Sequence, residues 1–107
     1  MKRNTTWDSI SVEYPFDITG KTFEIDFKDY STGTVVKRIT SNGVSPNSYI
    51  LVDLDIRKIY PIISATDSLL FQVDKLYIFD IVAVDGADVR RSPTIQLYAD
   101  PAVTAVT

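Results

Sequence analysis

The side chains that could do chemistry in this chain are few, because its 107 residues include no histidine and no cysteine. A base that titrates near neutral pH, a thiolate nucleophile and a zinc site built on imidazole or sulfur are therefore excluded. Carboxylates, lysines, tyrosines and hydroxyl groups remain. The sequence also has no glycine-rich phosphate loop and no serine in a nucleophile elbow. We predict that the chain is not an enzyme and that it has no catalytic residues and no cofactor.

Two pairs of aspartates are candidates for binding a cation. Asp53 and Asp55 are two residues apart in an expected strand, so they would share one face and could offer oxygen ligands to calcium. No calcium-loop spacing surrounds them, and we interpret them as part of a solvated strand face. Asp85 and Asp88 flank a turn, and turn chemistry is their expected role. We therefore predict no metal site.

Asp80 is unusual because it lies within an apolar run, 76–84. It could be a buried acid with a raised pKa, but we expect a carboxylate that faces the surface or pairs with an arginine.

Two pairs of adjacent basic residues, Lys37-Arg38 and Arg90-Arg91, could bind a phosphate or a partner's carboxylate. We expect both pairs on solvated strand edges, where positive charge deters edge-to-edge association. Trp7 and the six tyrosines could form a stacking platform for sugars or bases. The tyrosines are spread over separate segments, however, so we expect most of them in the core or at its rim.

Length and composition indicate one globular domain spanning 1–107. Hydrophobic residues make up 45% of the chain and charged residues 23%, and this length suffices to bury an ordinary core. The net charge of −3 argues against broad binding to nucleic acid or to an anionic membrane. The longest apolar stretches are interrupted by aspartates and fall short of the ~20 residues of a membrane-spanning helix, so we expect no membrane span. The first residues lack the apolar run of a signal peptide.

Period-two alternation of apolar and polar residues predicts strands with one buried face. The pattern is clearest at 22–28, where Phe23, Ile25 and Phe27 share one face. Turn residues then lead into 34–40, so a hairpin is expected. Further strands are expected at 10–16, 50–57, 76–84 and 89–98.

The segment 58–74 follows neither the helical nor the strand period. Pro61 opposes both a regular helix and a central strand. We expect a long connection that holds a helical turn or an extra short strand.

The last two expected strands flank Asp85-Gly86, a strong hairpin signal. A two-residue loop there would place Asp80 opposite Arg91, but it would also set apolar residues against polar ones. One more loop residue, forming a bulge, aligns Ala83 with Val89 and suits one buried face better. We therefore expect the bulged loop. About seven short strands with turns at near-regular spacing predict an all-β, antiparallel sandwich, with a small β-barrel as the alternative.

Short motifs in a fixed order cover nearly the whole chain. Asn4-Thr5-Thr6-Trp7 opens it, the turn Asp17-Ile18-Thr19-Gly20 leads into an alternating strand, and Tyr77-Ile78-Phe79-Asp80 precedes Asp85-Gly86. In this order the motifs resemble those of small phage tail and baseplate domains, with their GDTW-like opening, DLTG-like turn, YxYD strand and DG hairpin. The resemblance implies an immunoglobulin-like sandwich. Asn4 replaces the usual glycine, and the 58–74 connection is longer than the family's.

The resemblance also implies a function. The chain would be a bacteriophage virion structural protein that docks to other virion proteins in a tail, baseplate, neck or capsid-accessory position. It would form a homo-oligomer or a symmetric assembly and would be assembled in the host cytoplasm. The ends, 1–6 and 101–107, are candidates for arms that add strands to neighbours. The alternative is a carbohydrate- or receptor-binding adhesion module, which would need exposed aromatic residues such as Trp7, Tyr30 or Tyr60.

Overall fold

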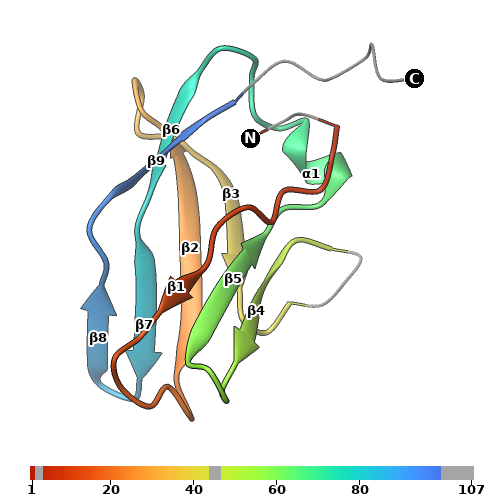
Figure 1. Cartoon of the computed structure of the whole chain (residues 1–107). Coiled ribbons are helices and arrows are strands. Elements are labelled where there is room, and N and C mark those ends of the chain that lie inside the picture. Colours follow the sequence, from red (N-terminus) through yellow and green to blue (C-terminus); the bar gives the residue numbers. More distant parts are fainter. Residues whose placement is uncertain (2–3, 44–46, 100–107) are drawn as a thin grey trace.

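The computed structural model describes residues 1, 4–43 and 47–99, and their regular structure is almost entirely β-strand (Figure 1). This confirms the predicted all-β class. The described elements follow the order β1 (Val12–Glu13), β2 (Thr22–Asp29), β3 (Val35–Thr40), β4 (Tyr49–Asp53), β5 (Lys58–Ile62), α1 (Ala65–Ser68), β6 (Leu76–Phe79), β7 (Ile81–Asp85), β8 (Asp88–Arg91) and β9 (Ile95–Tyr98). The described part thus holds nine strands rather than about seven, because β5 is additional and two of the expected runs are divided.

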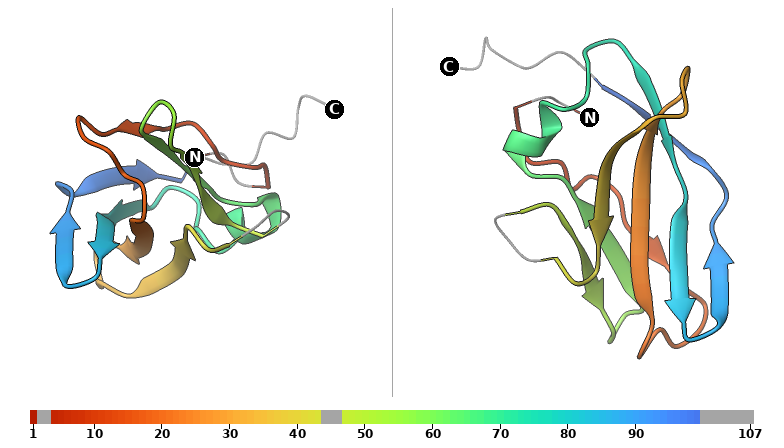
Figure 2. Two further views of the ribbon diagram at one scale, coloured as in Figure 1. Left: turned by 90° about the horizontal axis from the view of Figure 1, so that it is seen from below. Right: turned by 180° about the vertical axis from the view of Figure 1, so that it is seen from behind.

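The strands form two antiparallel sheets packed face to face. The smaller sheet has the order β1-β5-β4, and the larger has the order β8-β7-β2-β6-β9, with β3 on the other side of β2. The smaller sheet lies in front in Figure 1, and the view from below in Figure 2 shows the larger sheet curling around the core. The outer faces of the two sheets therefore lie on opposite sides of the molecule.

The core between the sheets is built from the alternating positions of the strands. Phe23, Ile25 and Phe27 on β2 are fully buried and face Ile59 of β5 across the interior. Trp7 lies before β1 and is also buried, with edge-to-face contacts at 6.2 Å to the ring of Phe27 and 6.5 Å to that of Phe79. Such aromatic contacts add to the free energy gained from burying apolar area.

The predicted hairpin between 22–28 and 34–40 is confirmed as β2 and β3. The carboxylate of Asp29 accepts hydrogen bonds from the backbone N–H and the hydroxyl of Ser31, and Gly33 N–H donates to the Asp29 carbonyl at 2.8 Å. Gly33 has a φ of +74°, a conformation that glycine adopts without steric cost. The turn residues therefore fix the register of this hairpin.

Two expected strands are shorter than predicted. Of the segment 10–16, Val12–Glu13 forms the strand that pairs with β5, and the Tyr14 N–H donates to the Arg57 carbonyl at 2.8 Å. The expected strand 50–57 ends at Asp53, because the chain turns there. The Asp53 carboxylate accepts a hydrogen bond from the Asp55 N–H at 3.1 Å, and Arg57 takes a φ of 54°. Apolar and polar residues continue to alternate from 54 to 57, but this part of the chain forms a turn and not a strand.

The segment 58–74 contains both of the features considered for it, the strand β5 and the helical turn α1. β5 is the central strand of its sheet, so the prediction that Pro61 excludes a central strand was wrong. Trp7 and Ile63 donate backbone hydrogen bonds to each other. Pro61 lies two residues before Ile63, so the N–H that proline lacks would point to the same side of β5, towards the segment that contains Trp7 and β1. Among the described residues the pairing on that side is interrupted between Trp7 and Val12, which makes the proline tolerable.

Both hairpin registers considered for Asp85-Gly86 were wrong. Asp85 pairs with Asp88, so the loop has two residues and begins at Gly86, whose φ is 62°. Glycine at the first loop position is typical of a type II′ turn. The irregularity lies further along instead: β7 and β8 pair Val82 with Arg91, whereas β6 and β9 pair Phe79 with Ile95, which leaves one extra residue between β8 and β9.

Candidate functional site

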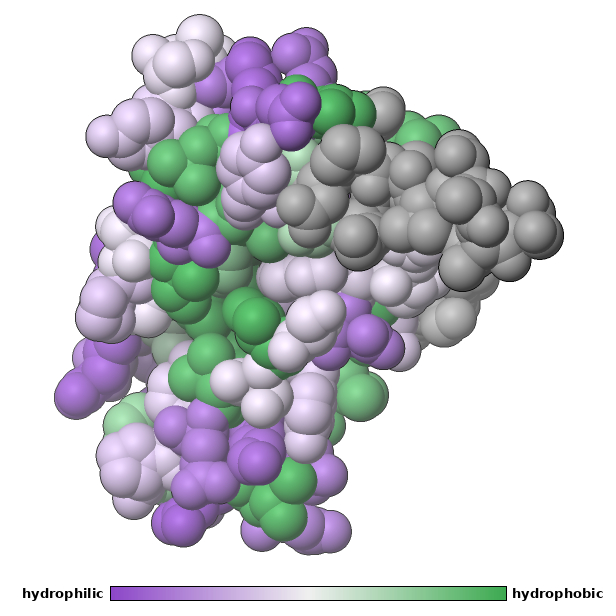
Figure 3. Space-filling model, turned by 45° about the horizontal axis from the view of Figure 1, so that its top comes forward, coloured by the Kyte–Doolittle hydropathy of each residue, from purple (hydrophilic) through white to green (hydrophobic). Residues whose placement is uncertain are grey.

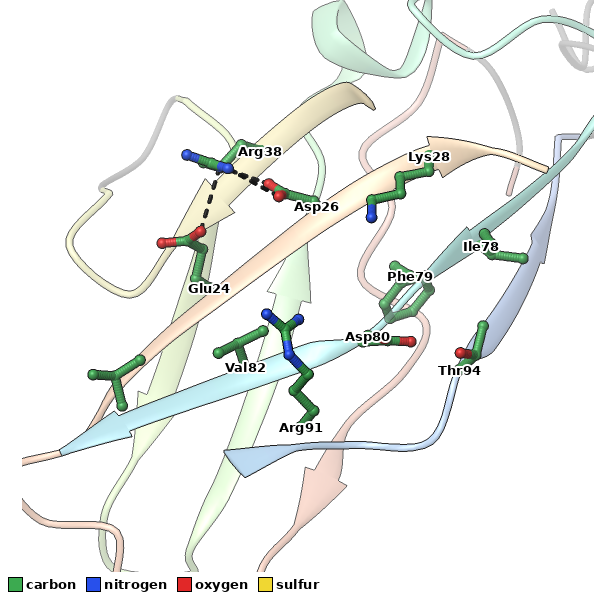
Figure 4. Close-up of a pocket in the computed structure, with 11 residues that line it drawn as sticks. Glu24, Asp26, Lys28, Arg38, Ile78, Phe79, Asp80, Val82, Arg91 and Thr94 are labelled. Atoms are coloured by element: carbon green, nitrogen blue, oxygen red, sulfur yellow. Dashed lines mark hydrogen bonds and ion pairs between the residues drawn. The ribbon is translucent and has the colours of Figure 1, made fainter. Parts of the chain in front are cut away.

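A hollow of about 300 Å³ lies on the outer face of the larger sheet, where charged residues from several strands meet (Figure 4). Arg38 of β3 donates two hydrogen bonds to the Asp26 carboxylate of β2, at 2.6 and 2.9 Å, and lies 3.4 Å from Glu24. The bond from Arg38 is the main cause that lowers the pKa of Asp26. We call this hollow, which Glu24, Asp26 and Arg38 line, the charged hollow.

Three further charged side chains border the charged hollow without a hydrogen bond or ion pair to any residue that the structure describes. They are Lys28, Asp80 and Arg91, and Figure 4 shows them around its open centre. The register of β2 with β6 and β7 sets Asp80 opposite Asp26 on the same outer face. Asp80 is half-buried and faces this outer surface rather than the core. Charges of both signs that stay open to solvent can discriminate between partners.

The two basic pairs lie on edge strands of the larger sheet, as predicted. Lys37-Arg38 is on β3, which pairs only with β2 in the described chain, and Arg90-Arg91 is on β8, which pairs only with β7. Arg90 donates to the carboxylate of Asp88 at 3.1 Å. That these charges deter edge-to-edge association stays a prediction.

The aspartates considered as cation ligands are used in turns and ion pairs. Asp53 caps the turn after β4, and Asp85 lies 3.6 Å from the ammonium of Lys21. Across the described ranges, no group of three or more acidic residues gathers in a way that could hold a metal ion.

Ser48, Ser64 and Asp67 form a polar network that the sequence reasoning missed. The Ser48 hydroxyl accepts from the Ser64 N–H at 2.8 Å and donates to Asp67 at 2.6 Å, while Ser64 caps α1 by accepting from the Asp67 N–H. The bond from Ser48 is the main cause that lowers the pKa of Asp67, and Lys37 lies 3.2 Å from the same carboxylate. Ser64-Ala65-Thr66-Asp67 has the spacing of a helix cap and could have revealed it. The network ties β3, β4 and α1 together and offers no exposed nucleophile.

The aromatic residues named for a ligand platform do not form one. Trp7 is 6% exposed and belongs to the core, whereas Tyr30 is 60% exposed in the turn after β2. The Tyr77 hydroxyl is buried and accepts a hydrogen bond from the Gln72 N–H. Trp7, Tyr30 and Tyr60 therefore do not share one binding surface.

A different apolar surface lies on the outer face of the smaller sheet. Strand pairing puts Tyr49 beside Ile62 and Leu51 beside Tyr60, and alternation places all four on the face away from the core. Leu51 is 45% exposed and the other three are half-buried. We call these four residues the outer patch. Figure 3, an oblique view of this side, shows hydrophobic residues reaching the surface along the middle of the molecule.

Comparison with protein-family models and with curated proteins found no match for this chain. No helix in the described segments is long and apolar enough to cross a membrane.

Proposed function

We propose that the chain is a structural subunit that acts by docking to other proteins, and that it does so in a bacteriophage particle. The order of the sequence motifs, which resembles that of small tail and baseplate domains, supports a place in a bacteriophage particle. The outer patch supports docking.

The observation that carries docking is that β4 and β5 have apolar side chains on both faces. Ile50 and Ile59 are buried in the core, while Leu51 and Tyr60 point to the other side. Near-continuous apolar runs are typical of strands that are covered on both faces. Within the described chain only the inner face is covered, so a second protein on the outer patch would complete the pattern. Aromatic and aliphatic residues are also common in the centres of protein interfaces.

The basic residues on the edge strands of the larger sheet are a second feature that suits a subunit of an assembly. β3 and β8 carry cations at the sheet edges, which disfavours uncontrolled strand pairing between copies. Docking would then proceed through faces rather than through these edges.

Particle incorporation tests the proposal directly. In phage made from the genome that encodes the chain, we expect mass spectrometry to detect it in purified particles. Leu51→Lys should reduce its copy number in particles by at least about tenfold, because a buried unpaired charge costs more than the ~1.4 kcal/mol of a tenfold change. Val89→Lys is the matched control, because Val89 is 55% exposed on β8, away from the outer patch.

Equal thermal stability of both variants would show that folding is intact. Normal incorporation of Leu51→Lys, or particles that lack the chain altogether, would contradict the proposal. A glycan-array signal that is lost in Tyr60→Ala, with no association with particle proteins, would instead favour the adhesion module.

A further inference from the structure

Exposed apolar side chains gather just after α1, at the end of the molecule where β9 also ends (Figure 1). Leu69, Leu70 and Val73 are 47%, 50% and 39% exposed. Phe71 lies between them in the sequence and is fully buried, so it anchors the segment while its neighbours stay at the surface. Single exposed apolar residues are common, but three of them within 69–73 suggest a contact surface. We call Leu69, Leu70 and Val73 the apolar loop.

Backbone hydrogen bonds hold the apolar loop in a defined conformation. The Leu70 N–H donates to the Asp67 carbonyl at 3.0 Å, and the Phe71 N–H donates to the Ser68 carbonyl at 3.2 Å. These bonds continue α1 as a tighter helical turn. The exposed leucines are therefore presented on an ordered part of the backbone.

The described chain ends beside the apolar loop. Ala99 is fully buried, its N–H donates to the Lys75 carbonyl at 3.0 Å, and its carbonyl accepts from the Asp74 N–H at 2.9 Å. Asp74 directly follows Val73, so the residues after Ala99 start next to the apolar loop. Figure 1 and the right-hand view of Figure 2 both show the end of β9 beside the segment that follows α1.

The sequence after Ala99 has the composition and the reach to cover the apolar loop. The segment 101–107, Pro-Ala-Val-Thr-Ala-Val-Thr, contains no charged residue. Val103 lies four positions beyond Ala99, so even an extended chain carries it no more than about 14 Å away. A short tether also keeps the segment near its own loop at an effective concentration of about millimolar, which favours this loop over that of a second copy.

We propose that the apolar loop binds the segment 101–107 of its own chain, through Val103 and Val106. Contact between these valines and the exposed leucines removes apolar area on both sides from water. The segment predicted to be an arm is then stored on its own subunit, and a neighbour that receives the arm must first displace it. This contact is separate from the outer patch and does not rest on docking there.

Nuclear magnetic resonance relaxation of the isolated protein tests the proposal. We expect amide order parameters of Val103 and Val106 above about 0.6, the upper limit for flexible backbone, and approaching the rigid value of about 0.85. Leu70→Glu should lower both below about 0.6, because it places a charge in the contact. Leu54→Glu is the matched control and should leave both unchanged, because Leu54 is 49% exposed in the turn between β4 and β5, at the other end of the molecule (Figure 1).

Substitutions in the segment itself give the reciprocal test. The double variant Val103→Asp with Val106→Asp should shift the amide signals of the apolar loop towards those of a variant that lacks 101–107. The double variant Thr104→Asp with Thr107→Asp adds the same charge at polar positions and should shift them less. Unchanged amide signals of the buried Ile25 would show that the core is intact in both.

Order parameters of Val103 and Val106 below about 0.6 in the parent protein, or unchanged values in Leu70→Glu, would overturn the proposal. Order that appears only as the protein concentration rises would also overturn it, in favour of a second copy as the partner. Leu51→Lys should leave the order parameters unchanged. Failure at the apolar loop is therefore distinguishable from failure at the outer patch.

Discussion

Single polar residues in this protein mainly hold turns and connections in place, and Asp29 is the clearest case. It is 7% exposed at the end of β2 and accepts hydrogen bonds from Ser31 and, at 2.6 Å, from the ammonium of Lys75. The bond from Lys75 is the largest cause that lowers the pKa of Asp29, from 3.8 to about 2. The folded chain thus favours the ionised form of Asp29.

Asp29 should make the stability of the protein depend on pH in the acid range. Because its pKa is lower in the folded chain, Asp29 stabilises the fold above pH ~4, and this contribution is lost as the pH falls from about 4 to about 2. Asp29→Asn should therefore be less stable than the parent at pH 7, and the difference should shrink over that range. Urea unfolding at several pH values measures it.

Lys75→Met provides the coupled control for this prediction. It should reproduce part of the loss at pH 7, and the double variant should lose less than the sum of the two single changes, because they remove the same bond. A constant difference between Asp29→Asn and the parent from pH 7 to pH 2 would contradict the assigned role.

Among the elements, the irregularity between β8 and β9 determines which side chains reach the charged hollow. At Ser92 a side-chain hydroxyl takes the place of a backbone carbonyl in the strand pairing. This hydroxyl accepts a hydrogen bond from the Ile81 N–H at 2.8 Å, and the Ser92 N–H donates to the Ile81 carbonyl at 2.9 Å. The extra residue at this point allows both Arg91 and Thr94 to line the hollow beside Asp80. Bulges commonly redirect side chains in this way.

Ser92→Ala should weaken the strands at this position. The Ile81 N–H would lose its acceptor in a buried setting, and such a loss costs about 1–3 kcal/mol in free energy of unfolding. We also expect faster hydrogen exchange at the Ile81 amide. Thr94→Ala, an exposed neighbour, is the control, and unchanged exchange at Ile81 in Ser92→Ala would show that the hydroxyl is dispensable.

The strands could be predicted from the sequence where a single rule decided them. Phe23, Ile25 and Phe27 alternate cleanly, and their strand was found almost to the residue. The 58–62 strand was not assigned, because Pro61 opposes a central strand unless the neighbouring pairing is interrupted, and that depends on the distant Trp7. The register after Asp85 was wrong because the loop begins at Gly86 rather than at Asp85, and local sequence does not distinguish these two positions.

The candidate surfaces were less predictable than the strands. The positions of the basic pairs on edge strands followed from their local sequence. The outer patch was missed because Leu51 and Tyr60 lie in different segments, and their meeting depends on the pairing of β4 with β5.

At the scale of the whole molecule, the segment before β1 joins the two sheets. Trp7 exchanges backbone hydrogen bonds with Ile63, next to β5, while its ring contacts Phe27 and Phe79 of the larger sheet. Asn4 N–H also donates to the hydroxyl of the buried Ser68 at 2.7 Å. The described residues of the predicted arm 1–6 are therefore bound to the body of the protein, and the predicted arm 101–107 lies outside the described residues.

Trp7→Ala should destabilise the whole fold rather than one sheet. Removing a buried tryptophan costs about 3–5 kcal/mol, a large part of the stability of an ordinary domain. We expect one cooperative transition at lower urea, with the same midpoint by circular dichroism and by tyrosine fluorescence. Tyr30→Ala, which alters a 60% exposed side chain, should change the free energy of unfolding by no more than about 0.5 kcal/mol. Separate midpoints for the two probes in Trp7→Ala would show that the sheets unfold independently.

The position of Trp7 also bears on how the protein is made. Its ring is among the first parts of the described chain to be synthesised, but its ring partner Phe79 and its backbone partner Ile63 come 72 and 56 residues later, and only Phe27 is nearer. At about 5–20 residues per second, the indole remains without its full set of native contacts for several seconds on each ribosome. A nascent chain with an uncovered aromatic ring is prone to aggregate, so expression at lower temperature or with added chaperones should raise the yield of folded protein.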